Sequence, residues 1–503
     1  MEQFLCECKL SERGFPMIPH EHIRPTARLL STSLVGRIVD EAFEVLASIG
    51  VLVENTGARR LLLDCGATES PTGRILMSRS LVERSLATAP REFTVWDVPA
   101  THSFRIGGDD VHFDPGSAAL RIFDHRVSAE REALTQDLVD FFRLTQRLEY
   151  FHFQSTGLTS SDVPPEAADF YRMFLAFQHC SKPIVTGTFT VAGFKPMLEM
   201  LLLLRNGADE LKARPLAIFD ACPSPPLKWS TLTSQSVIDC ARAGIPSEFV
   251  AMPLTGATAP VTLAGALVQH VAENLSGLVI AQCAAPGAPV VFGGSPSAFD
   301  HRKGTPPMGA IETMMLDMGA SQLGKSLGLP THAYIGLSDA KCVDAQAGLE
   351  TGIGAVLAAL AGINVVSGGG MMDYENCISL EKLIIDHEIL RMAYRLIDGI
   401  TPRDEPMARE LLADIVSGEE FMSHPHTVRW LRAEHWYPRI MDRGGANEWI
   451  ESGKPSLADR ASLERQRLLA GAPEPILAPD LLAELRVIVT RHAAARGLTS
   501  LPS

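Results

Sequence analysis

The residues of this chain that are best suited to bind or transform a polar substrate lie in two runs between Ser338 and Leu390. The first run contains Asp339, Lys341, Asp344 and Gln346, and the second contains Asp373, Tyr374, Glu375 and Asn376. Carboxylates hold cations or exchange protons, and aromatic rings hold cations against their faces. We predict Asp339 and Glu375 as the catalytic carboxyl groups of this site.

The segments around these runs have the pattern of βα units. The apolar segment Ile363–Val366 predicts a strand, and the residues that follow Ser379 predict an amphipathic helix. Polar residues at the carboxyl ends of such strands build the active sites of βα-repeat enzymes. Asp344 is also well placed to cap the helix that follows it, and we favour that role for it.

Eight such units follow one another along the chain, which predicts an α/β protein with a TIM (β/α)8 barrel. The predicted strands are 119–123, 150–153, 183–186, 215–219, 247–252, 289–292, 331–335 and 363–366. Each precedes a segment with helical periodicity, beginning near residues 136, 166, 194, 233, 261, 311, 345 and 380. We expect an N-terminal arm (1–34), a helical N-terminal domain (35–110), the barrel (111–400) and a C-terminal helical extension packed on the barrel (401–503). In the N-terminal domain, periodicity predicts helices at 39–49, 59–64 and 80–89, and a short hairpin is expected after Phe93. In the extension we predict helices at about 403–416, 425–433, 456–470 and 478–495.

Composition excludes several classes of protein. A net charge of −14 makes nucleic acid and anionic membranes poor partners. No long uncharged apolar run predicts a membrane span, and the acidic N-terminus does not resemble a secretory signal. The nine scattered cysteines indicate a reducing compartment, so we expect a cytoplasmic protein. Cys6 and Cys8 form a close pair without a second cluster, and we predict no metal site.

Several sequence blocks resemble the trimethylamine methyltransferase family of corrinoid-dependent enzymes. They are D-A-K-C-V-D-A-Q-A-G from Asp339, G-G-G-M from Gly368, S-L-E-K-L-I-I-D-H-E from Ser379, P-L-T-G-A-T-A-P-V-T-L-A-G-A-L from Pro253, P-G-A-P-V-V-F-G-G from Pro286 and H-P-H-T-V-R from His424. The resemblance covers roughly Val39 to Leu469 and departs from the family pattern at His112–Gly116.

The resemblance implies that a methyl group passes from a methylated amine to the Co(I) corrinoid of a separate cognate protein, with no intrinsic cofactor. One branch of the family contains pyrrolysine. This sequence shows standard residues, so it resembles the branch that acts on quaternary amines such as glycine betaine. Gly368, Gly369 and Gly370, with Met371, would let the corrin ring approach the backbone. Assembly into a homo-oligomer is compatible with these features.

A quaternary ammonium has no hydrogen to donate, so we expect aromatic rings around it. The rings near predicted strand ends are Phe189, Phe219, Phe292, Tyr334 and Tyr374. At least two should border one cavity, although barrel cores also bury such rings. A betaine carboxylate would need a cation, and the candidates are Lys341, Arg302 and His332.

Two other functions stay open at this point. A lyase or decarboxylase on the same scaffold would use strand-end carboxyl groups for acid–base chemistry. A strongly raised pKa at Asp339 or Glu375, without an aromatic cage, would favour it. A non-catalytic amine-binding protein would bind its ligand without turnover.

Overall fold

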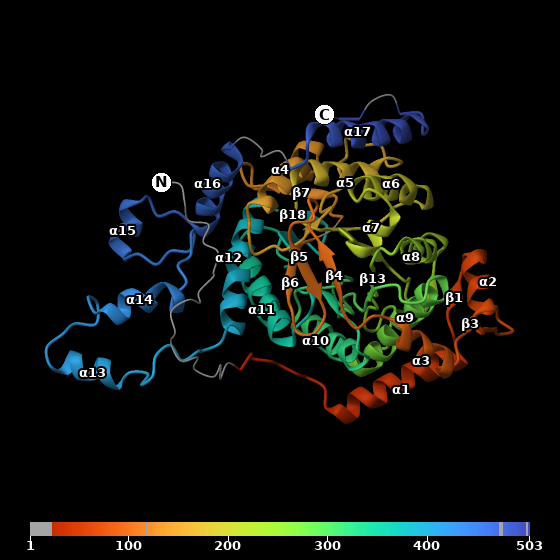
Figure 1. Cartoon of the computed structure of the whole chain (residues 1–503), viewed down its shortest axis with the longest axis horizontal. Helices are drawn as coiled ribbons and strands as arrows, with labels where there is room; N and C mark the ends of the chain where they lie inside the picture. The colour runs from red at the N-terminus through yellow and green to blue at the C-terminus, as the bar shows by residue number, and fades with distance from the viewer. Residues whose placement is uncertain (1–22, 117, 472–475, 499–500, 503) are drawn as a thin grey trace. The chain divides into compact units, whose positions relative to one another are not determined.

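The computed structural model describes residues 23–116, 118–471, 476–498 and 501–502 and has a mixed α/β architecture (Figure 1). Cys6, Cys8 and most of the predicted N-terminal arm lie outside the described residues. The chain divides into two compact units. The larger contains residues 26–394 and 438–503, and the smaller contains residues 395–437 with the described residues before Thr26.

The N-terminal part of the larger unit contains three helices, as predicted. Their bounds are α1 (Thr32–Ser48), α2 (Thr56–Asp64) and α3 (Arg79–Thr88), and the short strands β1 (Leu52–Val53), β2 (Thr68–Glu69) and β3 (Ile75–Leu76) lie between them. Helix α1 begins inside the predicted arm because the Ser31 side chain accepts a hydrogen bond from the Leu34 amide and so caps the helix there. The predicted hairpin is also present, as β4 (Phe93–Trp96) paired antiparallel with β5 (Ser103–Ile106).

Parallel strands form two sheets at the centre of the larger unit. The five-stranded sheet has the order β14-β13-β11-β10-β9, and the three-stranded sheet has the order β15-β16-β6. The bounds are β6 (His112–Pro115), β9 (Gln154–Ser155), β10 (Ile184–Thr186), β11 (Ala217–Ala221), β13 (Ser247–Phe249), β14 (Val290–Val291), β15 (His332–Tyr334) and β16 (Val365–Gly369). Isolated parallel bridges, Phe113 to Phe151 and Phe292 to Thr331, connect the ends of one sheet with the ends of the other.

One predicted strand is wrong. Segment 119–123 overlaps β7 (Arg121–Asp124), which pairs antiparallel with β8 (Ala129–Glu132). These two strands belong to a separate four-stranded sheet, together with β17 (Met371–Met372) and β18 (Cys377–Ile378). Strand β6 pairs with β16 in its place, with His112 opposite Val365. The physical reason is burial, because all four residues of β6 are buried while Arg121 of β7 is exposed.

Helices follow the central strands at the predicted places, and Figure 1 shows α8 to α12 curving around the strands. Their bounds are α4 (Thr135–Gln146), α5 (Ala168–His179), α6 (Phe194–Leu204), α7 (Ala208–Ala213), α8 (Thr231–Ala243), α9 (Leu263–Ala284), α10 (Ile311–Ser326), α11 (Ala345–Ala361) and α12 (Leu380–Ile397), with a 3-10 turn at Val191–Gly193 and the two-residue strand β12 (Lys228–Trp229). Among the described residues, α9 alone is long and apolar enough to cross a membrane, but it is mostly buried. It shares a hydrophobic core with α1 to α3, so it is a core helix.

The C-terminal region is helical, as predicted. It contains α13 (Arg409–Val416), α14 (Pro425–Glu434), α15 (Ala446–Glu451), α16 (Leu457–Ala470) and α17 (Pro479–Ala494). Helix α16 packs on α4, and α17 packs on α5 and α6. The short helix α15 was not predicted. Helices α13 and α14 belong to the smaller unit and have no buried residue.

Candidate active site

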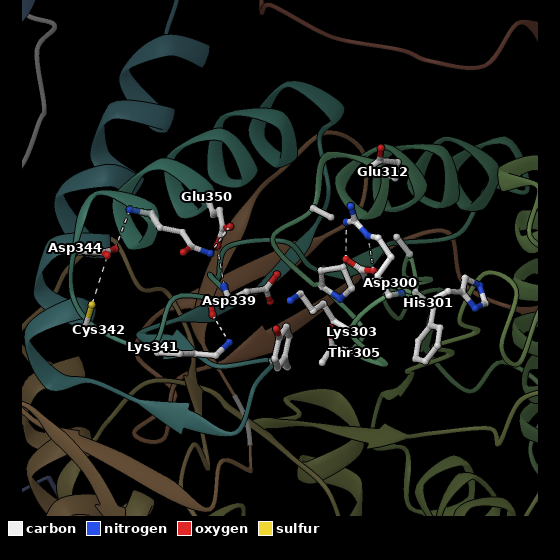
Figure 2. Close-up of a pocket in the computed structure, with 17 residues that line it drawn as sticks. Asp300, His301, Lys303, Thr305, Glu312, Asp339, Lys341, Cys342, Asp344 and Glu350 are labelled. Atoms are coloured by element: carbon white, nitrogen blue, oxygen red, sulfur yellow. Dashed lines mark hydrogen bonds and ion pairs between the residues drawn. The ribbon is translucent and has the colours of Figure 1, made fainter.

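A cavity of about 920 Å³ contains both ends of the first predicted polar run, Asp339 and Gln346. Its walls come from the loop that includes Asp300 and Lys303, from the residues after β15, from α11 and from Tyr374. Figure 2 shows Asp339 and Lys341 on one side of the cavity and the Asp300–Lys303 loop on the other. Arg302 on this loop is largely exposed, so the cavity reaches the surface.

Asp339 is fixed by backbone groups at the cavity wall. Its two carboxyl oxygens accept hydrogen bonds from the amides of Met308 (3.0 Å) and Gly309 (2.8 Å). Its own amide donates to Glu350 Oε2 at 2.8 Å, so α11 helps to position it. Burial raises the pKa of Asp339 to about 6, although the Gly309 bond opposes that rise. Asp339 therefore exchanges a proton near neutral pH.

Lys341 is already paired within the site. Its ammonium donates to the Asp339 carbonyl oxygen at 2.6 Å and lies 2.9 Å from Asp373 Oδ1. It also lies 3.8 Å from the centre of the Tyr374 ring. Lys341 therefore links the loops after β15 and β17. Asp344 caps α11, with its Oδ1 accepting from the Gln346 amide at 2.9 Å, which confirms the capping role.

Glu375 lies in a tight turn between β17 and β18. Asp373, Tyr374 and Glu375 have φ values of 48°, 53° and 67°, which non-glycine residues rarely adopt. This backbone turns Glu375 inward, and its Oε1 is buried without a hydrogen-bond partner. Burial, followed by the charges of Asp339 and Asp220, raises the pKa of Glu375 to about 8. Backbone strain of this kind is common at functional sites.

Four further carboxyl groups lie near Glu375 or near one another and were not among the predicted site residues. They are the buried Asp114 of β6, Glu248 of β13 and Asp317 of α10 and the half-buried Asp220 of β11. Each has at least one buried oxygen without a hydrogen-bond partner. Burial raises the pKa of all four. Repulsion from neighbouring carboxyl groups adds to the rise at Asp114, Glu248 and Asp317, whereas the Arg172 charge and a hydrogen bond with Glu248 oppose the rise at Asp220. Repulsion from Asp220 raises the pKa of Glu375, and repulsion from Glu375 raises the pKa of Asp317.

His332 lies beside this set of acids, but it is not a cation, because it is fully buried. Its Nε2 lies 3.0 Å from Ser367 Oγ and 3.2 Å from Glu248 Oε1, in a site with no exposed surface. Burial lowers the pKa of His332 to about 3, so the ring is neutral. Ser367 Oγ in turn donates to Asp114 Oδ1 at 2.6 Å. Arg302, another predicted cation, is paired with Asp300 at 2.7 Å.

The five predicted cage rings are dispersed. Phe219 packs edge-on against Phe194 of α6, and Phe292 packs against His270 of α9, so both face the helices. The Phe189 ring lies over the Arg172 guanidinium, 4.2 Å from its central carbon. Tyr334 is buried edge-on against His332. Tyr374 borders the cavity, and Phe299, which was not predicted, borders it as well.

The glycines predicted to approach a corrin ring are instead surrounded by the chain itself. A Cβ on Gly369 would lie 2.3 Å from the Phe151 ring, and one on Gly368 would lie 2.8 Å from Leu337 Cβ. Gly370 has the Leu383 side chain at 3.3 Å, and Met371 is fully buried. The space left by these missing side chains is filled by protein atoms. The cofactor contact at Gly368–Met371 therefore stays a prediction.

The site holds no metal-binding cluster among the described residues, since no group of three or more His, Cys, Asp or Glu side chains is placed to bind an ion. The arrangement is instead a cavity backed by several carboxyl groups, two of which titrate near neutral pH. Such a site can bind an organic cation through charge, and it can exchange protons.

Known proteins resemble the chain along most of its length. The profile described as trimethylamine methyltransferase (MTTB) matches residues 9–497. Trimethylamine methyltransferase MttB2 of Methanosarcina mazei is 31% identical over 476 residues, which cover 92% of this chain and 94% of the relative. Glycine betaine methyltransferase of Desulfitobacterium hafniense is 27% identical over 475 residues, which cover 94% and 98%. The crystal structure of the Methanosarcina barkeri monomethylamine methyltransferase (MtmB) matches with a TM-score of 0.50 and 11% identity over 88% of each chain, which shows a shared fold.

Proposed function

This chain belongs to the trimethylamine methyltransferase family, and from that premise we propose that it transfers a methyl group from a quaternary amine of the betaine type to the Co(I) corrinoid of a separate protein. The observation that carries the proposal is the group of buried carboxyl groups with unpaired oxygens behind the cavity. A quaternary ammonium offers charge but no hydrogen-bond donor, so a site for it has to supply negative charge without requiring hydrogen bonds.

We also infer that the eight central strands form a closed (β/α)8 barrel. Two parallel sheets with eight strands in all support this, as do the two parallel bridges that connect their ends. In such barrels the active site lies at the carboxyl ends of the strands. Asp339 follows β15 and Glu375 follows β16 and β17, so both belong to that end.

The proposed role of Asp339 and Glu375 is to hold the ammonium by charge. Asp339 is fixed by two amides and Glu375 by its constrained turn, so neither needs to reorganise when substrate binds. When the methyl group leaves, the nitrogen becomes neutral. The attraction to the carboxylates is then lost, which favours release of the product amine.

The methyl acceptor supplies a strongly nucleophilic Co(I) centre, and the chain's own task is to orient the N–CH3 bond towards it. The residues present fit an acceptor that arrives from outside, because the cavity wall includes the largely exposed Arg302. Phe299 and Tyr374 border the same cavity and are the rings available to contact a substrate methyl group there.

A second candidate function is an acid–base lyase or decarboxylase. The raised pKa values of Asp339 and Glu375 and the dispersed predicted rings are the observations that favour it. Family membership outweighs these observations. A site that binds cations through buried carboxyl groups also has raised carboxyl pKa values, so such values do not distinguish the two functions. A non-catalytic amine-binding protein has no observation in its favour.

The test mixes the protein, glycine betaine and a corrinoid protein reduced to Co(I). We expect Co(I) to be consumed, as followed by its visible spectrum, with one dimethylglycine formed per Co(I). Omitting the corrinoid protein should abolish product. Product that forms equally well without corrinoid would point to the acid–base enzyme, and binding without turnover across a panel of methylated amines would point to a binding protein.

A further inference from the structure

Arg172 is a buried cation whose donors lack enough hydrogen-bond acceptors. It lies in the apolar run of α5, Ala168–Phe177, in which every residue is buried, and it is 3% exposed. Its Nη1 donates to the Thr156 carbonyl oxygen at 3.2 Å, but its Nε is buried and has no hydrogen-bond partner. An unpaired buried donor destabilises the folded protein.

A second buried arginine shows what a structural role requires. Arg205 donates Nε to the Arg214 carbonyl, Nη1 to the Val98 carbonyl and Nη2 to the Asp97 carbonyl, at 2.7, 2.7 and 2.8 Å. Arg205 therefore bonds two other backbone segments, at residues 97–98 and at Arg214, and all three of its nitrogens have an acceptor. Arg172 bonds one, and its Nε is left without an acceptor.

The carboxylates near Arg172 do not fill this gap. Both Asp169 oxygens accept backbone amides, from Phe170 at 2.8 Å and from Phe189 at 3.2 Å. Asp220 and Arg172 shift each other's pKa, so they lie close together, but among the described residues no ion pair or hydrogen bond joins them. Asp220 Oδ1 is itself buried and unpaired.

The surroundings of Arg172 connect it to the candidate active site. The charge of Asp220 raises the pKa of Glu375. The charge of Asp339, at the cavity wall, raises the same pKa. On its other side, the guanidinium is covered by Phe189, which follows β10 and is 39% exposed. The guanidinium of Arg172 thus lies near the carboxyl group of Asp220, at the carboxyl end of the strands.

We propose that Arg172 binds the carboxylate of a zwitterionic quaternary amine while the buried carboxyl groups hold its ammonium. This inference rests on the proposed function and adds the residue that would select betaines over amines without a carboxylate. A guanidinium is well suited to this role because its planar fork donates two parallel hydrogen bonds to a carboxylate. Lys341, Arg302 and His332, the cations predicted from the sequence, are paired or neutral.

The test compares dissociation constants for glycine betaine and choline, measured by isothermal titration calorimetry without any corrinoid. Choline has the same trimethylammonium group but no carboxylate. The wild-type protein should prefer glycine betaine by about ten- to a hundredfold, since hydrogen bonds to charged groups contribute about 1.5–3 kcal/mol. Arg172→Gln should reduce this preference to less than about threefold and leave choline binding within about threefold of wild type.

Arg205→Gln is the matched control for removing a buried arginine and should retain the preference, with thermal unfolding measured for both variants. If Arg172→Gln does not fold, Arg172→Lys, which keeps the charge but loses the fork, should show a reduced preference. A wild-type protein that binds choline as well as glycine betaine overturns the inference. Preference that is lost in Arg302→Gln but kept in the Arg172 variants also overturns it. If no quaternary amine binds at all, the proposed function fails as well.

Discussion

Several effects that raise a carboxyl pKa act together on the side chain of Glu375. Its Oε1 is buried, lacks a hydrogen-bond partner and lies in the field of Asp339 and Asp220, although the residue as a whole is half-buried. All three effects oppose ionisation. The neutral form is therefore stable without a ligand, and the charged form becomes stable when a cation arrives. Both properties can be measured on the protein alone.

The first prediction concerns stability and pH. The folded pKa of Glu375 is about 8, against a usual value of 4.5. Between these values the folded state holds a proton that the unfolded state releases, so stability falls as pH rises through this window. Glu375→Gln cannot lose the proton. We expect its free energy of unfolding, from chemical denaturation, to fall less between pH 4.5 and pH 8 and to exceed that of wild type above pH 8.

The difference between the two proteins should be on the order of a few kcal/mol at the upper end of the window. Glu312→Gln removes an exposed carboxyl group at the border of the same cavity and serves as the control. Parallel curves for wild type and Glu375→Gln would show that Glu375 is ionised throughout.

The second prediction concerns proton release on binding. A quaternary ammonium favours the carboxylate form, so it lowers the pKa of Glu375 and expels its proton at pH values between this lowered pKa and about 8. Calorimetric titrations in buffers of different ionisation enthalpy should show release of up to about one proton per glycine betaine bound near neutral pH. Glu375→Gln should release less. Proton uptake, or equal release by both proteins, would contradict this account.

Among the elements, the β17–β18 turn is the one most clearly shaped for the site. Three successive non-glycine residues have positive φ, at a cost of about 1–2 kcal/mol each. The antiparallel pair Met372–Cys377 closes the turn, and Lys341 holds Asp373 and the Tyr374 ring on its outer side. These contacts keep Glu375 directed inward.

The third prediction separates this backbone strain from the carboxyl group. Glu375→Gly and Glu375→Gln both remove the charge, but only glycine adopts φ near 67° without steric cost. The glycine variant should therefore be more stable than the glutamine variant by about 1 kcal/mol. Urea unfolding of both proteins at one pH measures this difference. Equal stabilities would mean that the turn is not strained at this residue.

The elements that the sequence predicted well depend on local signals. The helices at 59–64 and 80–89, the hairpin after Phe93 and the cap at Asp344 follow from periodicity, turn residues and capping chemistry. Strand β6 was missed because His112-Phe113-Asp114-Pro115 is not an apolar run. Its partner is β16, about 250 residues away, where Ser367 bonds Asp114.

The candidate site was predicted in part for the same reason. The cavity is lined by Asp339, Lys341 and Tyr374, each of which follows a strand, and Glu375 lies close enough to Asp339 to feel its charge. Arg172 was missed because it lies in a helix, although a charged residue within an apolar helical run was the signal that could have found it. The sequence could not show that protein atoms lie where the side chains of Gly368, Gly369 and Gly370 would be, because it does not reveal which segments pack against a glycine.

At the scale of the whole molecule, the central strands depend on a few close contacts between distant segments. Phe151 bridges to Phe113 of β6, and β6 pairs with β16. Gly369, at the end of β16, lies opposite Pro115 and against the Phe151 ring. Three segments far apart in the sequence therefore meet at a position where only a hydrogen atom fits. This junction connects the three-stranded sheet to the five-stranded one.

The last prediction tests this junction. In Gly369→Ala the new Cβ would lie 2.3 Å from the Phe151 ring, which is fully buried. Overpacking of this kind costs about 1–3 kcal/mol, so the midpoint of thermal unfolding should fall. Gly348→Ala is the matched control, because no atom lies within 4 Å of its Cβ and alanine in a helix is favoured over glycine by about 1 kcal/mol. We expect opposite shifts in calorimetry, downward for Gly369→Ala and upward for Gly348→Ala. An unchanged midpoint in Gly369→Ala would mean that the strands separate at this junction, and the closed barrel would then have to be abandoned.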